Sequence, residues 1–260
     1  PYGRTQMGRD VRWSNNNTLT WKQKIQKHNY DIMLGHEVSY RNSEHLLGEA
    51  MDFPFDNLGN NNLGLGAVPS KVESGYSEKM LLSFFARANY SYNNRYLLTA
   101  TVRADGSTVF SQKNKWGFFP SFSAAWRVSE EEFMKDIKWL DMLKIKASYG
   151  TLGNQNLDKA YPAEPLLSNA YSAVFGKPSI IYPGYQLAYL PNPNLRWEKV
   201  EAWEAGFETN LLRNRLHFEG VYYKKNTKDL LAEVPGISGT IPGIGNLGQI
   251  QNKGVEMAVT

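Results

Sequence analysis

Apolar and polar residues alternate one by one along much of this chain. Residues 83–92 read S-F-F-A-R-A-N-Y-S-Y and residues 96–104 read Y-L-L-T-A-T-V-R-A, so every second position is apolar or aromatic and most others are polar. Because successive side chains of a strand point to opposite faces, each run predicts a strand with one apolar face. Only Asn93, Asn94 and Arg95 separate the two runs, which predicts an antiparallel hairpin.

The same alternation recurs along the rest of the chain. It is found at residues 19–26, 30–39, 121–128, 144–149, 203–208, 216–220 and 255–259. Together with the hairpin, these runs predict an all-β protein of about nine antiparallel strands, most of roughly ten residues. Roughly ten residues is the length that a tilted strand needs to cross an outer membrane.

The connections between these strands alternate in length. Short connections are expected near His28, at residues 93–95 and at residues 212–214. Long connections are expected at about residues 40–80, 105–116, 151–196 and 225–252. Short turns on one side and long extracellular loops on the other are typical of an up-and-down transmembrane β-barrel. A soluble sandwich usually has short strands at even spacing without this bias.

One link of intermediate length, residues 129–141, is expected to form a brief helix on the side of the short turns. Ser129 and Glu132 have the spacing of a capping box. Phe133, Ile137 and Leu140 would then share one face of the helix. The pattern therefore predicts a short helical segment between two strands.

Charged residues of both signs recur on the polar face of the predicted strands. They are Arg87, Arg103, Arg127, Lys144, Lys146, Glu204, Glu208 and Glu256. Such charges suit a hydrated lumen, where they can pair and contact water, and would be costly inside a dry sandwich. We therefore interpret these residues as lumen-facing and the apolar residues opposite them as lipid-facing. The solvated outer face of a soluble sheet is the alternative interpretation of this pattern.

Composition narrows the range of functions. Aromatic residues make up 13% of the 260 positions, with 15 Tyr and 7 Trp, and several gather near predicted strand ends, as the girdles of membrane barrels do. The formal charge of +4 comes from 29 basic and 25 acidic residues scattered along the chain. No basic stripe results, so no nucleic-acid partner is expected. The chain has no cysteine and no long apolar stretch, which excludes disulfides, thiolate chemistry and a transmembrane helix.

No motif in the chain predicts catalysis. Gly243, Gly245 and Gly248 have the spacing of a dinucleotide fingerprint, but no strand–helix context surrounds them, so a flexible loop is the better interpretation. The four histidines lack the spacing of zinc ligands. No serine, histidine and acid set indicates a nucleophilic triad. We therefore expect no catalytic, metal or cofactor site in this chain, and no enzyme activity.

The predicted loop at residues 151–196 is rich in tyrosine and proline. Its candidate contacts with a ligand or a partner protein are Tyr161, Tyr171, Tyr182, Tyr185 and Tyr189. Rings stiffened by nearby prolines can stack on a sugar or dock another protein. They can equally pack on one another to keep a long loop ordered. Both interpretations stay open on the sequence alone.

Several long motifs, in order, resemble one known family. They are R-Y-L-L-T-A-T-V-R-A-D-G-S (95–107), K-W-G-F-F-P-S-F-S-A-A-W-R-V-S-E-E-E-F-M (115–134), L-K-I-K-A-S-Y-G-T-L-G-N-Q-N (143–156), P-N-P-N-L-R-W-E-K (191–199), Y-Y-K-K-N-T-K-D-L-L (222–231) and N-L-G-Q-I-Q-N-K-G-V-E-M (246–257). This stretch, from about residue 81 onward, resembles the SusC/RagA-like TonB-dependent transporters of the bacterial outer membrane. Thr108 and Val109 depart from the family, which more often has a small and then a basic residue there. The first 80 residues match mainly by their strand pattern.

The resemblance implies a function that the alternation alone does not. Members are barrels of about 22 strands with an N-terminal plug, and they import glycans or peptides with energy relayed by TonB. They commonly pair with a SusD-like surface lipoprotein that closes the barrel like a lid. Residues 1–260 would then be part of one transmembrane barrel domain, bounded by outer-membrane lipid. With about nine strands and no plug motif, we expect a mid-barrel fragment of a longer protein.

Two rivals to this interpretation come from other classes of protein. One is a soluble or surface-exposed β-rich carbohydrate-binding protein, which would need no detergent for its extraction. The other is a barrel enzyme, which should place a nucleophile or an acid pair at the rim.

Overall fold

The computed structural model describes residues 2–55, 61–157, 159–175, 180–236 and 241–260, and this part of the chain is almost entirely β-structure. Its strands are β1 (Tyr2–Ile25), β2 (His28–Met51), β3 (Val68–Tyr92), β4 (Tyr96–Ser107), β5 (Trp116–Arg127), β6 (Leu140–Asn154), β7 (Leu167–Phe175), β8 (Ile180–Leu187), β9 (Glu198–Leu211), β10 (Leu216–Lys228), β11 (Leu231–Val234), β12 (Gly243–Asn246) and β13 (Gln249–Val259). The all-β class expected from the alternation is confirmed.

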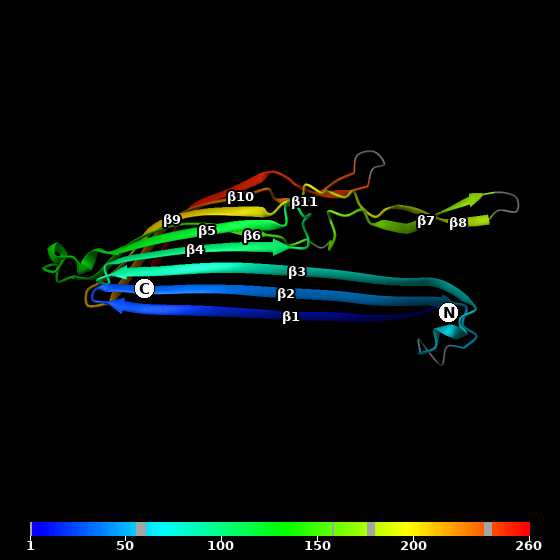
Figure 1. The fold of residues 1–260 in the computed structure, drawn as a ribbon, viewed down its shortest axis with the longest axis horizontal. Coiled ribbons are helices and arrows are strands. Elements are labelled where there is room, and N and C mark those ends of the chain that lie inside the picture. Colours follow the sequence, from blue (N-terminus) through cyan, green and yellow to red (C-terminus); the bar gives the residue numbers. More distant parts are fainter. Residues whose placement is uncertain (1, 56–60, 158, 176–179, 237–240) are drawn as a thin grey trace. The chain divides into compact units, whose positions relative to one another are not determined.

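Nine strands form one sheet in the order β1-β2-β3-β4-β5-β6-β9-β10-β13. Each strand lies beside its neighbour along the chain, apart from two inserted hairpins, β7–β8 and β11–β12. The registers of β4 with β5, β5 with β6, β6 with β9, β9 with β10 and β10 with β13 are all antiparallel. The ribbon in Figure 1 shows β4, β5 and β6 side by side. This is the up-and-down topology that the sequence predicts.

The chain divides into two compact units. The first comprises residues 1–15 and 38–81, and the second comprises residues 16–37 and 82–260. In the first unit, Arg41 donates a hydrogen bond to the Asp10 carboxylate at 2.8 Å, and the rings of Trp13 and Tyr40 stack with centroids 5.7 Å apart. The second unit contains β4 and every strand that follows it.

The hairpin expected at residues 83–104 is present as the end of β3 and the start of β4. Asn93 and Asn94 form its turn with φ angles of 51° and 56°. Both angles lie in the left-handed region, which asparagine tolerates better than most residues. Arg95 N–H donates to the Tyr92 carbonyl at 2.9 Å and closes the turn. The two asparagines therefore fix the register that brings the alternating runs together.

From β4 to β13 the sheet presents two chemically different faces. One face, here called the apolar face, exposes large side chains that include Phe122 (50% exposed), Trp203 (57%) and Met257 (71%). These residues are exposed although they are apolar, which is the pattern of a surface that meets lipid or a partner and not water. The opposite face carries charged side chains along the middle of β6, β9 and β10.

Several buried side chains of the second unit gather around the connection between β4 and β5. Trp197 packs against Phe110 and Phe119, with ring centroids 4.9 and 5.5 Å away, and its Nε1 donates to the Lys115 carbonyl at 3.2 Å. Leu195, close to Trp197 in the sequence, is completely buried. The connection before β9 is thus anchored by an aromatic cluster at this end of the strands.

All four of the expected long connections are shorter than the sequence suggested or contain strands. β2 continues to Met51 and β3 begins at Val68, so only residues 52–67 join them, where a loop was expected at 40–80. The strand signal is missing there because polar residues occupy consecutive positions, as in 41–45, and leave no apolar face. The connections expected at 151–196 and 225–252 contain the hairpins β7–β8 and β11–β12, and the one expected at 105–116 spans residues 108–115.

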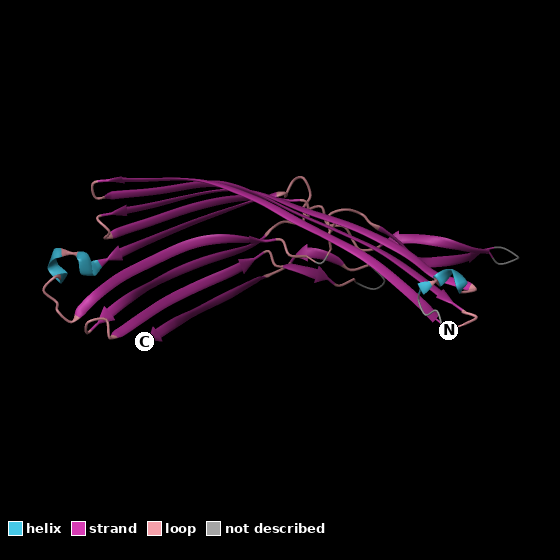
Figure 2. Ribbon diagram, turned by 90° about the horizontal axis from the view of Figure 1, so that it is seen from below, coloured by secondary structure: helices cyan, strands magenta, loops and turns pink. Residues whose placement is uncertain are grey.

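The prediction of a helix at residues 129–141 is wrong. The link forms two 3-10 turns, η3 (Val128–Glu130) and η4 (Glu132–Met134), and neither begins with a side-chain cap. Another described turn of this kind, η2 (Leu63–Leu65), lies between β2 and β3. Figure 2 shows that helical turns are confined to connections between strands. Within the described residues, no helix is long and apolar enough to cross a membrane.

Candidate functional site: the charged face of the sheet

Charged side chains of β6, β9, β10 and β13 come together on one face of the second unit. The strand register makes Lys144, Glu208 and Glu219 neighbours in one row, because Lys144 pairs with Glu208 and Glu208 pairs with Glu219. One step further along the strands, Lys146 lies in the row that ends at Glu256. Alternation places every second residue on this face, so these rows form one charged face. We use that name for Lys144, Lys146, Glu204, Glu208, Glu219 and Glu256.

Lys146 bridges two carboxylates from two different strands. Its Nζ donates to Glu208 Oε1 at 2.6 Å and to Glu219 Oε1 at 2.5 Å, while Lys144 Nζ donates to Glu208 Oε2 at 3.1 Å. Glu208 and Glu219 are direct cross-strand partners, so without the lysine two like charges would oppose each other. The lysines therefore hold β6, β9 and β10 together while their charges stay on the surface of the sheet.

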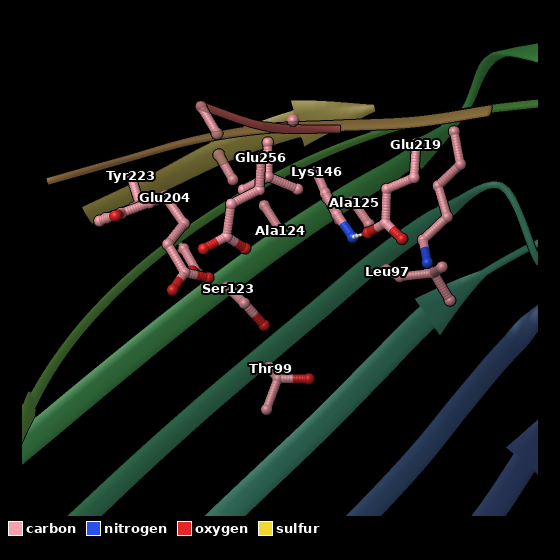
Figure 3. A pocket seen from close by; sticks show the side chains of 16 residues that line it. Leu97, Thr99, Ser123, Ala124, Ala125, Lys146, Glu204, Glu219, Tyr223 and Glu256 are labelled. Atoms are coloured by element: carbon pink, nitrogen blue, oxygen red, sulfur yellow. Dashed lines mark hydrogen bonds and ion pairs between the residues drawn. The ribbon is translucent and has the colours of Figure 1, made fainter. Parts of the chain in front are cut away.

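Beside this network lies an open hollow of about 580 Å³. Lys146, Glu204, Glu219, Tyr223 and Glu256 line it from β6, β9, β10 and β13, as Figure 3 shows. β4 and β5 contribute Leu97, Thr99, Ser123 and Ala125 to its lining. Because the hollow is open and combines charged, hydroxyl and small apolar side chains, it has room for water or a polar solute.

A second charged cluster surrounds Arg103 on β4. Its guanidinium donates to Glu37 at 3.1 Å, to Asp105 at 2.7 Å and to Ser83 Oγ at 2.9 Å. The same guanidinium lies 5.6 Å from the centre of the Phe85 ring. Every one of these partners belongs to the second unit. Arg103 thus ties β2, β3 and β4 together as Lys146 ties β6, β9 and β10.

The structure brings together some of the charges expected to share a face. Lys144, Lys146, Glu204, Glu208 and Glu256 gather on the charged face. Arg127 lies on the same side of the sheet, directly opposite Lys144, and Arg103 forms a cluster of its own. Arg87 is exposed. The candidate residues chosen from the sequence did not include Glu219, Glu37 and Asp105, although the alternation at 30–39 and 216–220 places Glu37 and Glu219 on the polar side. Glu219 follows the same alternation along β10 as its neighbours, so the period-two pattern could have identified it.

The tyrosines of the 151–196 connection divide into two groups. Tyr189 is buried (6% exposed), its hydroxyl donates to the Tyr161 carbonyl at 2.5 Å, and Lys159 lies 4.7 Å above its ring. Burial also raises the pKa of the Tyr189 hydroxyl. The burial of Tyr189 and its hydrogen bond to Tyr161 therefore favour packing within the loop over contact with a ligand. Tyr182 and Tyr185 on β8 are 49% and 68% exposed, and the side chain of Tyr171 lies outside the described residues.

An ion pair anchors the connection between β10 and β13. Arg196 donates to Asp229 at 2.6 Å, and this guanidinium holds the pKa of the Asp229 carboxyl below its usual value. Asn246 of β12 donates to the Arg196 and Asp229 carbonyls at 2.8 and 2.9 Å. The glycine triplet around Gly245 lies in this region, where β12 pairs antiparallel with β11. Among the described residues the triplet thus lies in an antiparallel hairpin, whereas a dinucleotide site requires a parallel strand followed by a helix.

The described residues contain no group of three or more His, Cys, Asp or Glu side chains arranged to hold a metal ion. The charged face is instead internally paired at its centre, with carboxylates, a phenol and small polar side chains around the pairs. Such an arrangement can orient and screen polar molecules along the face.

An up-and-down antiparallel sheet with one exposed apolar face and one ion-paired face is the wall of a membrane β-barrel. The chain belongs to the TonB-dependent receptor-like β-barrel family, whose family model matches residues 1–260. That family resides in the bacterial outer membrane and consists of transporters and receptors, not enzymes. The expected family, fold class and location are confirmed.

Relatives and solved structures agree with this assignment. A TonB-dependent receptor of Formosa agariphila is 37% identical over 252 residues, which cover 95% of this chain and 25% of the relative. The TonB-dependent receptor SusC of Bacteroides thetaiotaomicron is 37% identical over 185 residues, covering 69% of this chain and 18% of SusC. The structure of the RagAB peptide transporter matches with a TM-score of 0.86 and 29% identity, covering 98% of this chain and 28% of that chain. This chain therefore spans 18–28% of the length of these three proteins.

Proposed function

We propose that this chain forms part of the wall of an energy-coupled importer of the outer membrane. In this proposal the charged face lines the lumen, the apolar face meets lipid, and the connections after β2, β4, β6 and β10 lie outside the cell. Substrate captured on the outside passes along the charged face once the barrel opens. The lining side chains bind and orient polar groups, and they carry out no chemical step.

The observation that carries this proposal is the ion-paired centre of the charged face. Lys144, Lys146, Glu208 and Glu219 satisfy one another across three strands and leave an open hollow beside them. Charges of both signs within a membrane protein are tolerated where they pair and meet water. A lumen offers both conditions, and lipid offers neither.

We propose an oligomeric nutrient, a glycan or a peptide, as the substrate. RagAB, whose structure is similar to this chain at a TM-score of 0.86, is a peptide transporter, which supports a peptide. The exposed rings of Tyr182 and Tyr185 suit stacking on a sugar, which supports a glycan. Both substrate classes carry many hydrogen-bonding groups, and the mixed charge of the lumen face suits either.

We also propose the partners that the family resemblance implies. A plug within the barrel would contact TonB, which relays the energy for import. A SusD-like surface lipoprotein would close the barrel from outside, over the connections that hold β7–β8 and β11–β12. Tyr182 and Tyr185 are the described candidates in the β7–β8 hairpin for contact with that lid or with substrate.

Deletion of the gene for the full-length protein tests the transport function. We expect growth and uptake of labelled substrate to fail on one class of a panel of glycans and peptides, and loss of TonB to produce the same defect. Normal growth and uptake on every member of the panel would contradict the proposal.

Two pairs of substitutions test whether Tyr182 and Tyr185 contact the substrate or the lid. Tyr182→Ala with Tyr185→Ala should weaken uptake severalfold, whereas the matched Tyr→Phe pair keeps the stacking rings and should retain most uptake. Equal uptake by the alanine and phenylalanine pairs would show that these rings do not contact substrate or lid.

A further inference from the structure

A row of three alanines crosses the apolar face. Ala124 of β5 pairs with Ala147 of β6, and Ala147 pairs with Ala205 of β9. All three lie on the apolar side of the alternation, where the rows on either side carry large side chains. Three methyl groups in register therefore form a depression on an otherwise bulky surface.

Aromatic rings form the walls of this depression. The row on one side contains Phe122, Tyr149 and Trp203, which are consecutive cross-strand partners, and the Tyr149 and Trp203 ring centroids are 4.4 Å apart. Tyr222 closes the end of the alanine row as the partner of Ala205. The groove lined by these side chains has a volume of about 390 Å³. We call it the alanine groove.

The apolar band ends directly beside the groove. Along β10 the outward residues change from Tyr222 to Lys224, and along β13 they change from Val255 to Lys253. Lys224 is the direct partner of Trp203 on one side and of Lys253 on the other. The end of the apolar band, marked by Tyr222 and Trp203, is where the membrane interface lies in a barrel of this kind.

The two lysines form an unusual pair. Directly opposed residues of an antiparallel pair have Cβ atoms about 5 Å apart, and like charges in that position destabilise the sheet. Among the described residues, no ion pair is recorded for Lys224 or Lys253. The acid nearest in register on this face, Glu201, is already paired with Lys228 at 2.7 Å. The pair therefore presents two adjacent positive charges that an anion can neutralise.

We propose that the alanine groove and the lysine pair together bind one phosphorylated lipid of the outer leaflet. An acyl chain lies along Ala124, Ala147 and Ala205 against the aromatic walls, and a phosphate of the head group lies between Lys224 and Lys253. The apolar and cationic parts are contiguous in the same order as the tail and head of such a lipid. This inference rests on the proposed function and its orientation, in which the connection after β10 is extracellular.

Charge complementarity selects a lipid over other occupants of the groove. The phosphate neutralises the repulsion between the lysines, and basic residues at the membrane surface attract anionic lipid head groups. A second protein chain would need to bring an acidic group to the same point. That chain would also need a bulky side chain that fits into the alanine groove.

Native mass spectrometry of the full-length protein tests the proposal. The protein is purified in detergent and mixed with lipid A, or with the same lipid A after removal of its phosphates, and the retained lipid is counted. We expect the wild-type protein to retain phosphorylated lipid A preferentially. The pair Lys224→Gln with Lys253→Gln should lower that retention at least about tenfold, given about 1 kcal/mol of attraction per lysine. Filling the groove with Ala147→Phe should lower retention of both lipids.

The control is Lys225→Gln, the adjacent lysine of β10 on the opposite face, which should leave lipid retention unchanged. Equal retention by wild type, the lysine pair and Ala147→Phe, or no preference for the phosphorylated lipid, would overturn the inference. A change of oligomeric state in Ala147→Phe with lipid retention unchanged would assign the groove to a second copy and also overturn it. Substrate uptake is measured on the same variants, so a failure of lipid binding with normal import leaves the transport proposal intact.

Discussion

Glu131 ties together several side chains at the end of the sheet that carries the short turns. Its Oε1 accepts hydrogen bonds from the Tyr96 hydroxyl at 2.7 Å and from Trp126 Nε1 at 3.1 Å, and its Oε2 accepts from Arg95 at 3.0 Å. Tyr96 and Trp126 also stack on each other with centroids 6.4 Å apart. The hydrogen bonds from Tyr96 and Trp126, together with the charge of Arg95, hold the pKa of Glu131 below its usual value.

Replacing Glu131 by Gln should lower the temperature at which the full-length barrel loses its heat-resistant mobility on gels. A carboxyl whose pKa is lowered by folding stabilises the protein above its ordinary pKa, and that stabilisation is lost as the pH falls through the lowered value. The difference between wild type and Glu131→Gln should therefore be present at pH 7 and shrink at about pH 3. A difference that is equally large at both pH values would contradict this role of the charge.

Lys146 is the centre of the charged face, and its removal should expose the repulsion between Glu208 and Glu219. We expect Lys146→Met to lower the free energy of unfolding by about 1–2 kcal/mol, measured by urea titration in lipid bilayers. Lys144→Met removes one hydrogen bond to Glu208 and should cost less. Adding Glu219→Gln to Lys146→Met should recover part of the loss, and a double variant no more stable than Lys146→Met would argue against the repulsion.

At the scale of elements, the alternation predicted the strands wherever one face is apolar. It identified the hairpin of β3 and β4 and the strands β5, β6, β9, β10 and β13, because one side of each is apolar over several residues. It missed the parts of β2 and β3 at residues 40–51 and 68–80, where polar residues on both sides remove the period-two signal. Backbone pairing with neighbouring strands, which a single sequence does not display, sustains those parts.

The link between β5 and β6 shows the limit of local motifs. Ser129 and Glu132 have the capping-box spacing, yet the adjacent Glu131 is held by Arg95, Tyr96 and Trp126, and residues 128–134 form 3-10 turns. Contacts with residues distant in the chain outweigh the local preference for a helix. The charged face was predictable for the same reason as the strands. Its pairings, including that of Glu219 with Lys146, depend on strand register and were not.

The Phe119 ring packs closely against backbone near the start of β5. The Phe119 ring, which is buried, lies over Gly117 and Gly153, and a Cβ added at Gly153 would lie 2.0 Å from its Cζ atom. Gly153→Val should therefore displace the ring and cost about 1–3 kcal/mol of unfolding free energy. The control is Gly150→Ala, where the new Cβ would lie 3.2 Å from the small Ser121 side chain and should cost less. Equal stability of the two variants in urea titration would show that the ring can move freely.

At the scale of the whole molecule, the central claim is that one face of the second unit meets lipid and the other meets water. The apolar face, the charged face and the membership of the TonB-dependent receptor-like β-barrel family agree on that division. The transport proposal and the lipid site depend on it, because the first needs a hydrated lumen and the second needs a lipid-facing wall.

Collision measurements on spin-labelled single cysteines test this claim most directly. The 260 residues contain no cysteine, so Phe122→Cys and Met257→Cys report on the apolar face while Ser123→Cys and Ala258→Cys report on the charged face. In the full-length protein in bilayers, we expect labels at 122 and 257 to collide mainly with lipid-soluble oxygen. Labels at 123 and 258 should collide mainly with a water-soluble nickel chelate. The same accessibility at adjacent positions, or the reverse order, would contradict the account.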